Sequence, residues 1–341
     1  MNESICTLLS PLSFAGLTLR NRIVMPPMFS GFAGSGGEVT DQIVEYHRLR
    51  AAGGAALIVV EHTYVHPWGR ISDTQMGVHD DSMIPGLARL ASAIRREGAV
   101  SCLQLAHAGA STSAAVIGRP PVGPSSLRHP FEKDVDPAQA ANIAEIEQIV
   151  KAFGDAAARA RAAGFDAVEI HSAHGYLLSQ FLSPLTNHRE DEYGGTEANR
   201  VRVHLEVLAE VRARVGREFP VFVRLGMHDE ALGGLQLNEA IQAAIRLVDG
   251  GINLVDVSGG LQGSQAPVVV ARGPGWFVPY AQAVKAAVRV PVLVTGGFTD
   301  AVHADRVIRE GRADLIGVGR AMLDDPNWAR AAIDLLRRQS A

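Results

Sequence analysis

Two histidines and a tyrosine follow a short apolar run near the middle of the chain. The run covers residues 167–170, and the letters HSAHGY after it place His171, His174 and Tyr176 within six residues. A single histidine in such a position is usually a structural residue. Two ring hydrogen-bond donors and a phenol that leave the same strand end indicate a reacting site instead.

Two other chemistries compete for this cluster. A zinc pair favours two histidines four residues apart on a helix with a glutamate between them, and that pattern is absent here. A Schiff-base aldolase needs a lysine at a strand end. The chain has three lysines, Lys133, Lys151 and Lys285, of which we place the first in a loop and the others in helices. Both alternatives are therefore disfavoured.

A second group of residues has the composition of a phosphate site. The run at 290–294 leads into Gly296 and Gly297, and the last run ends in GVGR, which contains Gly319 and Arg320. Glycines let backbone N–H groups approach phosphate oxygens, and an arginine adds a bidentate charge. Either loop alone could be a tight turn and nothing more. Both together, in this order, predict a phosphorylated ligand or cofactor.

Two polar residues lie at the ends of other apolar runs. Gln104 ends the third run and Arg224 lies near the end of the fifth. Each alone could be a satisfied polar group of the core. An inward arginine is costly unless it faces an anion.

The elements that must position these residues are eight short apolar runs. They cover residues 23–28, 55–60, 100–105, 167–170, 221–225, 254–257, 290–294 and 313–318. The runs are continuous rather than alternating, as expected for strands buried on both faces. Eight such strands alternating with helices predict a single α/β domain, a (β/α)8 or TIM barrel, over residues 1–341. A doubly wound open sheet in two domains is the alternative, but no G-x-G-x-x-G motif follows any run.

Helix boundaries are read from caps and glycines. Asp136 and Pro137 predict the start of a helix over 138–163 that Gly164 stops. Other helices are predicted after Asn238, from Asp300 to Gly311, and after Asp325 and Pro326. Two connections, 107–130 and 172–195, are too long for plain crossovers. Both leave the C-terminal ends of strands, where a barrel keeps its active site.

Composition excludes several classes of protein. Charged residues make up 20% of the chain, and 32 basic against 36 acidic residues form no basic stripe for nucleic acid. The N-terminus lacks the pattern of a secretory signal, and no apolar stretch reaches the ~20 residues of a membrane span. Two cysteines, Cys6 and Cys102, cannot build a disulfide framework or a four-thiolate iron–sulfur site. We therefore expect a cytoplasmic protein that binds neither nucleic acid nor membrane.

Residues 171–195, HSAHGYLLSQFLSPLTNHREDEYGG, closely resemble the signature of the old yellow enzyme family. Further similar motifs occur in the same order: NRIVMPPM at 21–28, GRISD at 69–73, LQLAHAG at 103–109, VTGGF at 294–298 and GVGRAML at 317–323. Several motifs in one order make the resemblance specific. It extends over nearly the whole chain.

The resemblance implies a flavin cofactor, FMN, and a role for each candidate residue. Pro27 and Met28 are expected to line the flavin ring, Gln104 to bond its pyrimidine edge, and Arg224 to face N1 and O2. The loop with Gly296 and Gly297, together with Gly319 and Arg320, is expected to hold the phosphate. His171 and His174 would donate to a substrate carbonyl oxygen, and Tyr176 would supply the proton.

The implied reaction has two halves. NADH or NADPH binds transiently and reduces FMN. An α,β-unsaturated carbonyl compound then receives hydride at its β-carbon and a proton from Tyr176 at its α-carbon. Members of the family also lead us to expect a homo-oligomer.

The chain departs from the family pattern at two positions. Phe29 stands where members usually have a cysteine or threonine beside flavin O4, which predicts a shifted reduction potential unless Ser30 or another residue replaces that contact. Ala198 replaces a common glutamate and is interpreted as structural. Some relatives use a terminal arginine that reaches into a neighbouring subunit, a part that Arg337 or Arg338 could take, although two arginines in a closing amphipathic helix are more often surface residues.

Rival functions remain at this point. The barrel also resembles the first domain of dienoyl-CoA reductases and amine dehydrogenases, whose iron–sulfur cluster the two cysteines cannot hold. Oxidation or demethylation on a lone barrel stays open. A flavin-binding protein without turnover is disfavoured, because a binder needs no proton donor. The loops 107–130 and 264–276 would set the substrate.

Overall fold

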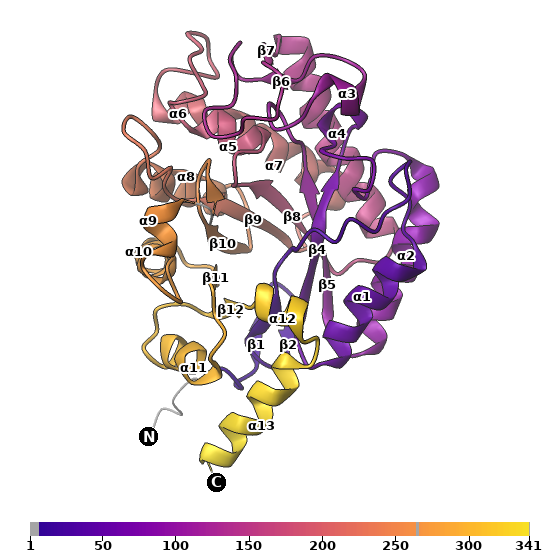
Figure 1. Cartoon of the computed structure of the whole chain (residues 1–341), viewed down its shortest axis with the longest axis vertical. Helices are drawn as coiled ribbons and strands as arrows, with labels where there is room; N and C mark the ends of the chain where they lie inside the picture. Colours follow the sequence, from indigo (N-terminus) through magenta and orange to yellow (C-terminus); the bar gives the residue numbers. More distant parts are fainter. Residues whose placement is uncertain (1–6, 264–265, 341) are drawn as a thin grey trace.

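The computed structural model describes residues 7–263 and 266–340. Cys6 and the first two residues of the predicted loop 264–276 lie outside the described residues. Eight parallel strands close into a barrel with helices outside it (Figure 1). The predicted barrel class is therefore confirmed. Within the described ranges, no helix combines the length and the apolar character that a membrane span requires.

The barrel strands correspond one to one to the eight predicted runs. They are β3 (Ile23–Met25), β4 (Leu57–Tyr64), β5 (Val100–Ala106), β8 (Ala167–Ser172), β9 (Val221–Gly226), β10 (Leu254–Ser258), β11 (Val292–Thr295) and β12 (Leu315–Gly317). Neighbours in the barrel follow chain order, and β12 pairs with β3 to close it. Every residue of β8 and β9 is buried, since one side of each strand faces the barrel interior and the other faces the helices.

A hairpin that the sequence did not reveal closes the N-terminal end of the barrel. Strands β1 (Leu12–Phe14) and β2 (Leu17–Leu19) pair antiparallel. The Phe14 ring lies 5.8 Å from the ring of Phe222 in β9. Leu12, Phe14 and Leu17 pack on an interior cluster contributed by all eight barrel strands. The hairpin fills this end with apolar side chains, and the candidate site residues lie at the opposite end.

Helices of two sizes surround the strands. The longer ones are α1 (Asp41–Ala52), α2 (Ile84–Arg96), α4 (Ile143–Ala162), α7 (Arg202–Val215), α8 (Leu237–Asp249), α10 (Val278–Ala287), α11 (Ala301–Arg309) and α13 (Trp328–Ser340). Short helices lie in the connections: α3 (Ala114–Ile117), α5 (Leu177–Leu182), α6 (Glu197–Arg200), α9 (Pro267–Val270) and α12 (Arg320–Asp324). Helix α13 runs to the C-terminus at the lower end of the view in Figure 1.

Two predicted helix starts were wrong. Helix α4 begins at Ile143 rather than 138, because Asn142 and Glu145 form a reciprocal capping box. Residues 139–140 instead form strand β7 (Gln139–Ala140), which pairs with β6 (Val122–Gly123), and the Asp136 carboxylate accepts a hydrogen bond from Ala114 N. Helix α8 starts at Leu237, before Asn238, because Gln236 and Glu239 form its capping box.

The other helix ends agree with the prediction. The Asp300 side chain accepts from Val302 N at 2.9 Å and begins α11. Gly164 has φ +85° just after α4, a left-handed conformation that glycine adopts without strain. Asp325 accepts from Asn327 N at 2.8 Å before α13.

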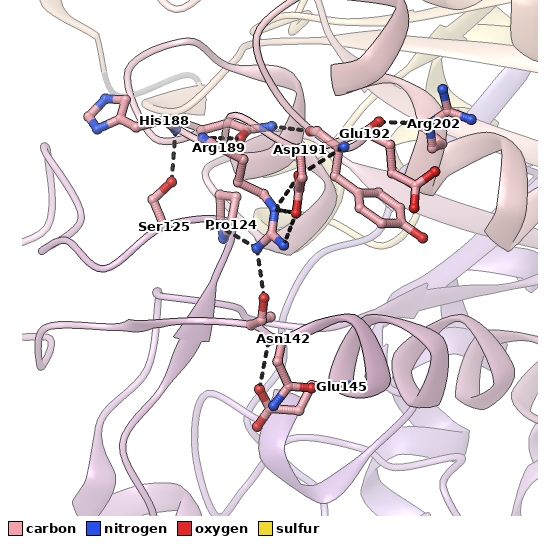
Figure 2. A network of polar contacts seen from close by, with 12 residues as sticks. Pro124, Ser125, Asn142, Glu145, His188, Arg189, Asp191, Glu192 and Arg202 are labelled. Carbon is pink, nitrogen blue, oxygen red and sulfur yellow. Dashed lines mark hydrogen bonds and ion pairs between the residues drawn. The ribbon is translucent and has the colours of Figure 1, made fainter.

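The two long connections are bound to each other by Arg189 (Figure 2). Its guanidinium donates to Pro124 O at 3.1 Å and to Ala141 O at 2.6 Å, and it pairs with Asp191. His188 N donates to the Ser125 hydroxyl at 2.8 Å. The second half of the signature motif therefore has a structural role: it binds the segment between β5 and α4. The candidate catalytic residues lie in the first half of the motif.

Candidate active site

The catalytic candidates lie together where β8 leaves the barrel. His171 is on β8, paired in register with Arg224 of β9, and His174 and Tyr176 lie in the turn before α5. The His171 ring centre is 5.1 Å from that of His174 and 5.0 Å from that of Tyr176. The cluster expected from the sequence is thus formed in three dimensions.

The turn is sterically demanding. His174 has φ +61°, which is uncommon for a residue other than glycine. Gly175 follows with φ +78°, and a Cβ there would lie 2.6 Å from His129 Nε2. Such backbone geometry occurs where the surrounding structure holds a side chain in a defined direction. Here it places His174 over the barrel mouth.

Burial sets the protonation states of the cluster. Loss of hydration lowers the pKa of His171 and of His174 well below the usual histidine range, with the mutual histidine repulsion and Arg224 adding to it for His171. Both rings are therefore neutral near pH 7. The same burial raises the pKa of the Tyr176 phenol above its ordinary value, so the phenol keeps its proton. His174 Nε2 lies 2.6 Å from Ser258 Oγ, and buried His171 Nδ1 has no hydrogen-bond partner among the described residues.

Two cavities meet at His174. One has a volume of about 210 Å³ and is lined by Pro27, Met28, His174, Arg224, Ser258, Trp276, Phe277, Thr295, Gly296, Gly297, Phe298, Thr299, Gly319 and Arg320. The other, of about 510 Å³, is lined by Ile71, Ser111, Phe131, Glu132, His174, Tyr176, Leu261, Gln262 and Gly263. All but three of the predicted residues line the first cavity. Tyr176 lines the second, while Gln104 and His171 are buried and line neither.

The first cavity has a glycine-lined wall. Gly297 has φ +73°, and a Cβ there would lie 2.4 Å from the Trp276 ring. A Cβ on Gly319 would lie 2.9 Å from Met28 Sδ. The N–H groups of Gly297 and Gly319 donate to no backbone carbonyl in the described part of the chain. The Arg320 guanidinium stacks 5.2 Å from the Trp276 ring centre, an aromatic partner that the sequence did not indicate.

Four buried polar side chains lie side by side on β5, β8, β9 and β10. Gln104 donates to Glu169 at 2.9 Å, and Arg224 Nε lies 3.2 Å from Asp256 Oδ2. Burial raises the pKa of Glu169, and the neighbouring charge of Asp256 raises it further, which favours the protonated acid. Arg224 Nε approaches Asp256 as an ion pair without hydrogen-bond geometry. Sequence reasoning found Gln104 and Arg224 but missed Glu169 and Asp256. Each of these acids is a single polar residue within a short apolar run, and no motif marked it.

Phe29 and Ser30 follow the strand that carries Pro27 and Met28 to the cavity. The Phe29 ring is 42% exposed and stacks on His62 at 5.1 Å. Ser30 N donates to the buried Glu61 carboxylate at 2.7 Å. Glu61 therefore anchors the turn beside the cavity, a role that no sequence pattern indicated.

Replacing Glu61 by glutamine should flatten the pH dependence of stability. Burial raises the Glu61 pKa to about 7, against 4.5 for an ordinary glutamate. The native state therefore keeps a proton that the unfolded chain has released, so the stabilisation is present below pH 4.5 and is lost as pH rises to 7. At 1.36 kcal/mol per pKa unit the change is about 3 kcal/mol. Urea unfolding of the wild type and of Glu61→Gln at pH 5 and pH 8 measures this change. If the free energy of unfolding changed equally between the two pH values in both proteins, the prediction would be refuted.

Helix α13 contains both terminal arginines considered above. Arg337 lines a cavity of about 300 Å³ together with Arg20 and Arg330, and this cavity shares no lining residue with the two at the barrel mouth. Within one protomer Arg337 thus lies apart from the histidine cluster. A contribution to a neighbouring subunit stays a prediction.

A neutral histidine pair, a protonated phenol and a glycine-lined cavity at the C-terminal ends of barrel strands define a cofactor-binding barrel with a reacting site. The model of the NADH:flavin oxidoreductase / NADH oxidase family matches residues 7–338, and the chain belongs to this family. The chain is 39% identical over 327 residues to an NADPH dehydrogenase of Bacillus licheniformis, covering 95% of this chain and 93% of the relative. It is 38% identical over 320 residues to an NADH oxidase of Thermoanaerobacter brockii, covering 93% of this chain.

The chain spans only 49% of the length of that NADH oxidase. Among solved structures, an old yellow enzyme homologue from Zymomonas mobilis superimposes with a TM-score of 0.84 at 29% identity, covering 96% of this chain and 93% of that one. The resemblance drawn from the motifs is confirmed. The family is one of flavin oxidoreductases, and family membership indicates FMN as the cofactor.

The first cavity fits such a cofactor. It offers free backbone N–H groups, Arg320 for a phosphate and Arg224 for the electron-rich edge of a ring. Trp276 Nε1 and Thr295 Oγ1 are buried at its wall and have no hydrogen-bond partner among the described residues. Buried polar atoms of this kind are usually satisfied by a ligand or water.

Proposed function

We propose that the protein is an FMN-dependent oxidoreductase that reduces the activated C=C bond of α,β-unsaturated carbonyl compounds with NADH or NADPH. Residues 1–341 act as one FMN-binding barrel domain, and we place it in the cytoplasm. The observation that carries the proposal is the meeting of two cavities at His174, with a neutral histidine pair and a protonated phenol at the junction.

FMN occupies the first cavity in this proposal. Gly296, Gly297, Gly319 and Arg320 hold its phosphate, Pro27 and Met28 line its ring, and Gln104 and Arg224 face its pyrimidine edge. When bound, it supplies hydride that a nicotinamide has delivered. Asp256 pairs with Arg224 at 3.2 Å beneath this edge.

The protein side chains act on the substrate in the second cavity. His174, which lines both cavities, and His171, whose buried ring centre lies 5.1 Å from it, donate to a carbonyl oxygen at the junction of the cavities and stabilise the charge that grows there. Tyr176 gives its proton to the α-carbon. The neutral state of the histidines keeps the cluster from attracting anions in the ground state, and burial excludes water from the reacting atoms.

A visible absorption spectrum of the purified protein tests the proposal. Flavin bands should bleach on anaerobic addition of NADH or NADPH and return on addition of cyclohexenone. Bands that bleach without returning would reject enone reduction and favour the oxidation or demethylation alternative. Absence of flavin, even after reconstitution with FMN, would reject the cofactor assignment as well.

Replacing Phe29 by cysteine should raise the flavin reduction potential. A thiol beside the ring can donate to charge that develops on reduction, whereas the phenyl ring cannot. One hydrogen bond of ~1 kcal/mol corresponds to roughly 20 mV for a two-electron couple. Redox titration with a reference dye measures the shift, and Phe29→Leu is the matched control because it removes the ring without adding a donor. Equal potentials in the cysteine and leucine variants would contradict the tuning role.

A further inference from the structure

The second cavity contains a carboxylate that the proposed reaction does not use. Glu132 lies on the loop between β5 and α4 and lines the cavity together with His174 and Tyr176. Glu132, His174 and Tyr176 are the only ionisable residues among the described residues that line this cavity. Ser111 Oγ contacts both Glu132 at 2.9 Å and the carbonyl oxygen of Gly175, the residue before Tyr176, at 2.8 Å, which brings Glu132 to the same part of the cavity.

Among the described residues, no charged neighbour balances the Glu132 carboxylate, and burial raises the pKa of this carboxyl above the ordinary glutamate value. One carboxylate oxygen lies 2.9 Å from Ser111 Oγ, whose single proton is shared between this oxygen and Gly175 O at 2.8 Å. His129 Nδ1 lies 3.8 Å away, but burial lowers the His129 pKa to about 4, so the ring is neutral. Phe131 N also donates to Nδ1 at 3.4 Å, which makes this nitrogen an acceptor. No arginine or lysine forms an ion pair with Glu132 in the described part of the chain.

The loop that carries Glu132 is held in a fixed path. Arg189 binds the carbonyl groups of Pro124 and Ala141 on either side of it, as Figure 2 shows for Pro124. At the other wall, Gln180 accepts from Ala110 N at 3.0 Å and donates to Gly175 O at 2.5 Å, which fixes the segment that carries Ser111. The side chain of Glu132 is 36% exposed, so its second oxygen can reach a ligand.

We propose that Glu132 is a specificity-determining residue that selects substrates with a positively charged nitrogen on the part remote from the activated carbonyl. His174 and Tyr176 hold the reacting end of the substrate, and Glu132 faces the rest of it from the same cavity. A cation there gains a partly desolvated ion pair, and a carboxylate there meets a like charge. The inference rests on the proposed function for the orientation of the substrate.

Binding of saturated ketones to the oxidised holoenzyme tests the inference without turnover. The probes are cyclohexanones with an aminomethyl, a methyl or a carboxylate group on the carbon opposite the carbonyl, titrated by calorimetry. We expect the aminomethyl ketone to bind about tenfold or more tightly than the carboxylate ketone, with the methyl ketone between them. The ratio of these two affinities, aminomethyl over carboxylate, should fall with added salt, because Glu132 is partly exposed.

Three variants make the test specific. Glu132→Gln keeps the shape and should bring the ratio to within about threefold, and Glu132→Lys should reverse the order. Asp134→Asn removes the same charge two residues along the loop from an exposed side chain, so the wild-type ratio should persist. Equal ratios in the wild type and Glu132→Gln, both with normal FMN content, would overturn the inference.

Failure of this inference can be told from failure of the proposed function. Charge discrimination that depends on Glu132 in a protein that does not reduce cyclohexenone supports the binding role and rejects only the reaction. Cyclohexenone reduction with a ratio that Glu132→Gln does not change leaves the reaction intact and rejects the specificity role.

Discussion

Replacing Tyr176 by phenylalanine is expected to lower enone reduction by roughly 10²–10⁴-fold, the usual contribution of a positioned general acid. The change removes the proton donor and little else, because no hydrogen bond of the Tyr176 hydroxyl supports the fold in the described residues. Stopped-flow measurement separates the two halves of the reaction. Flavin reduction by NADH or NADPH should stay within about threefold of wild type, while reoxidation by cyclohexenone should slow by the full factor.

Tyr193→Phe provides the matched control for this prediction. Tyr193 belongs to the same signature motif, but its hydroxyl donates to Glu206 at 3.1 Å, outside both cavities at the barrel mouth. Its loss should affect stability and leave reoxidation unchanged. A Tyr176→Phe protein that reoxidises at the wild-type rate would show that another group, or solvent, delivers the proton.

The pH profile gives a second readout for Tyr176. Burial, with a smaller contribution from Glu132, raises the pKa of the phenol above its ordinary value of 10.0. The acid form therefore persists through the neutral range and well into alkaline solution. A decline of reoxidation between pH 8 and pH 10 with a phenol-like inflection would contradict this environment.

The barrel was predictable because its strands are buried on both faces. Runs such as 55–60 and 290–294 contain only apolar residues, and their alternation with helices indicated a parallel barrel. The hairpin of β1 and β2 escaped because three-residue strands have no periodicity. The start of α4 was misplaced because Asp136 offers the same cap chemistry as Asn142, and only the pairing of β6 with β7 decides between them.

The candidate site was predictable where residues sit at strand ends. His171, Arg224 and Gly297 were found because the barrel brings all C-terminal strand ends to one mouth. Trp276 and Glu132 were not, because their positions depend on the path of long loops that no local pattern sets. Asp256 was missed for a different reason. It lies within a buried strand, and only its 3.2 Å approach to Arg224 shows that it neutralises part of the charge there.

Removing the N–H donor of His174 is expected to slow enone reduction by roughly 10²–10³-fold, as loss of an oxyanion-stabilising donor does. His174→Ala loses the donor and also places alanine at φ +61°. His174→Asn is the matched variant, because asparagine tolerates a left-handed backbone and its amide can donate. We expect the asparagine variant to keep most of the rate, measured as reoxidation by cyclohexenone, and both variants to keep FMN.

The same two histidines should add no inflection of their own to the pH profile of reoxidation between pH 6 and pH 8. Burial lowers the pKa of His171 and His174 well below the ordinary histidine value of 6.5, so neither ring gains a proton in this range. A neutral ring always has one N–H to donate, and that donor persists as pH rises. An inflection near pH 6.5 that disappears in His174→Asn would show a charged imidazolium in the working state. Donation by neutral rings would then be rejected, and electrostatic attraction by a cation would have to replace it.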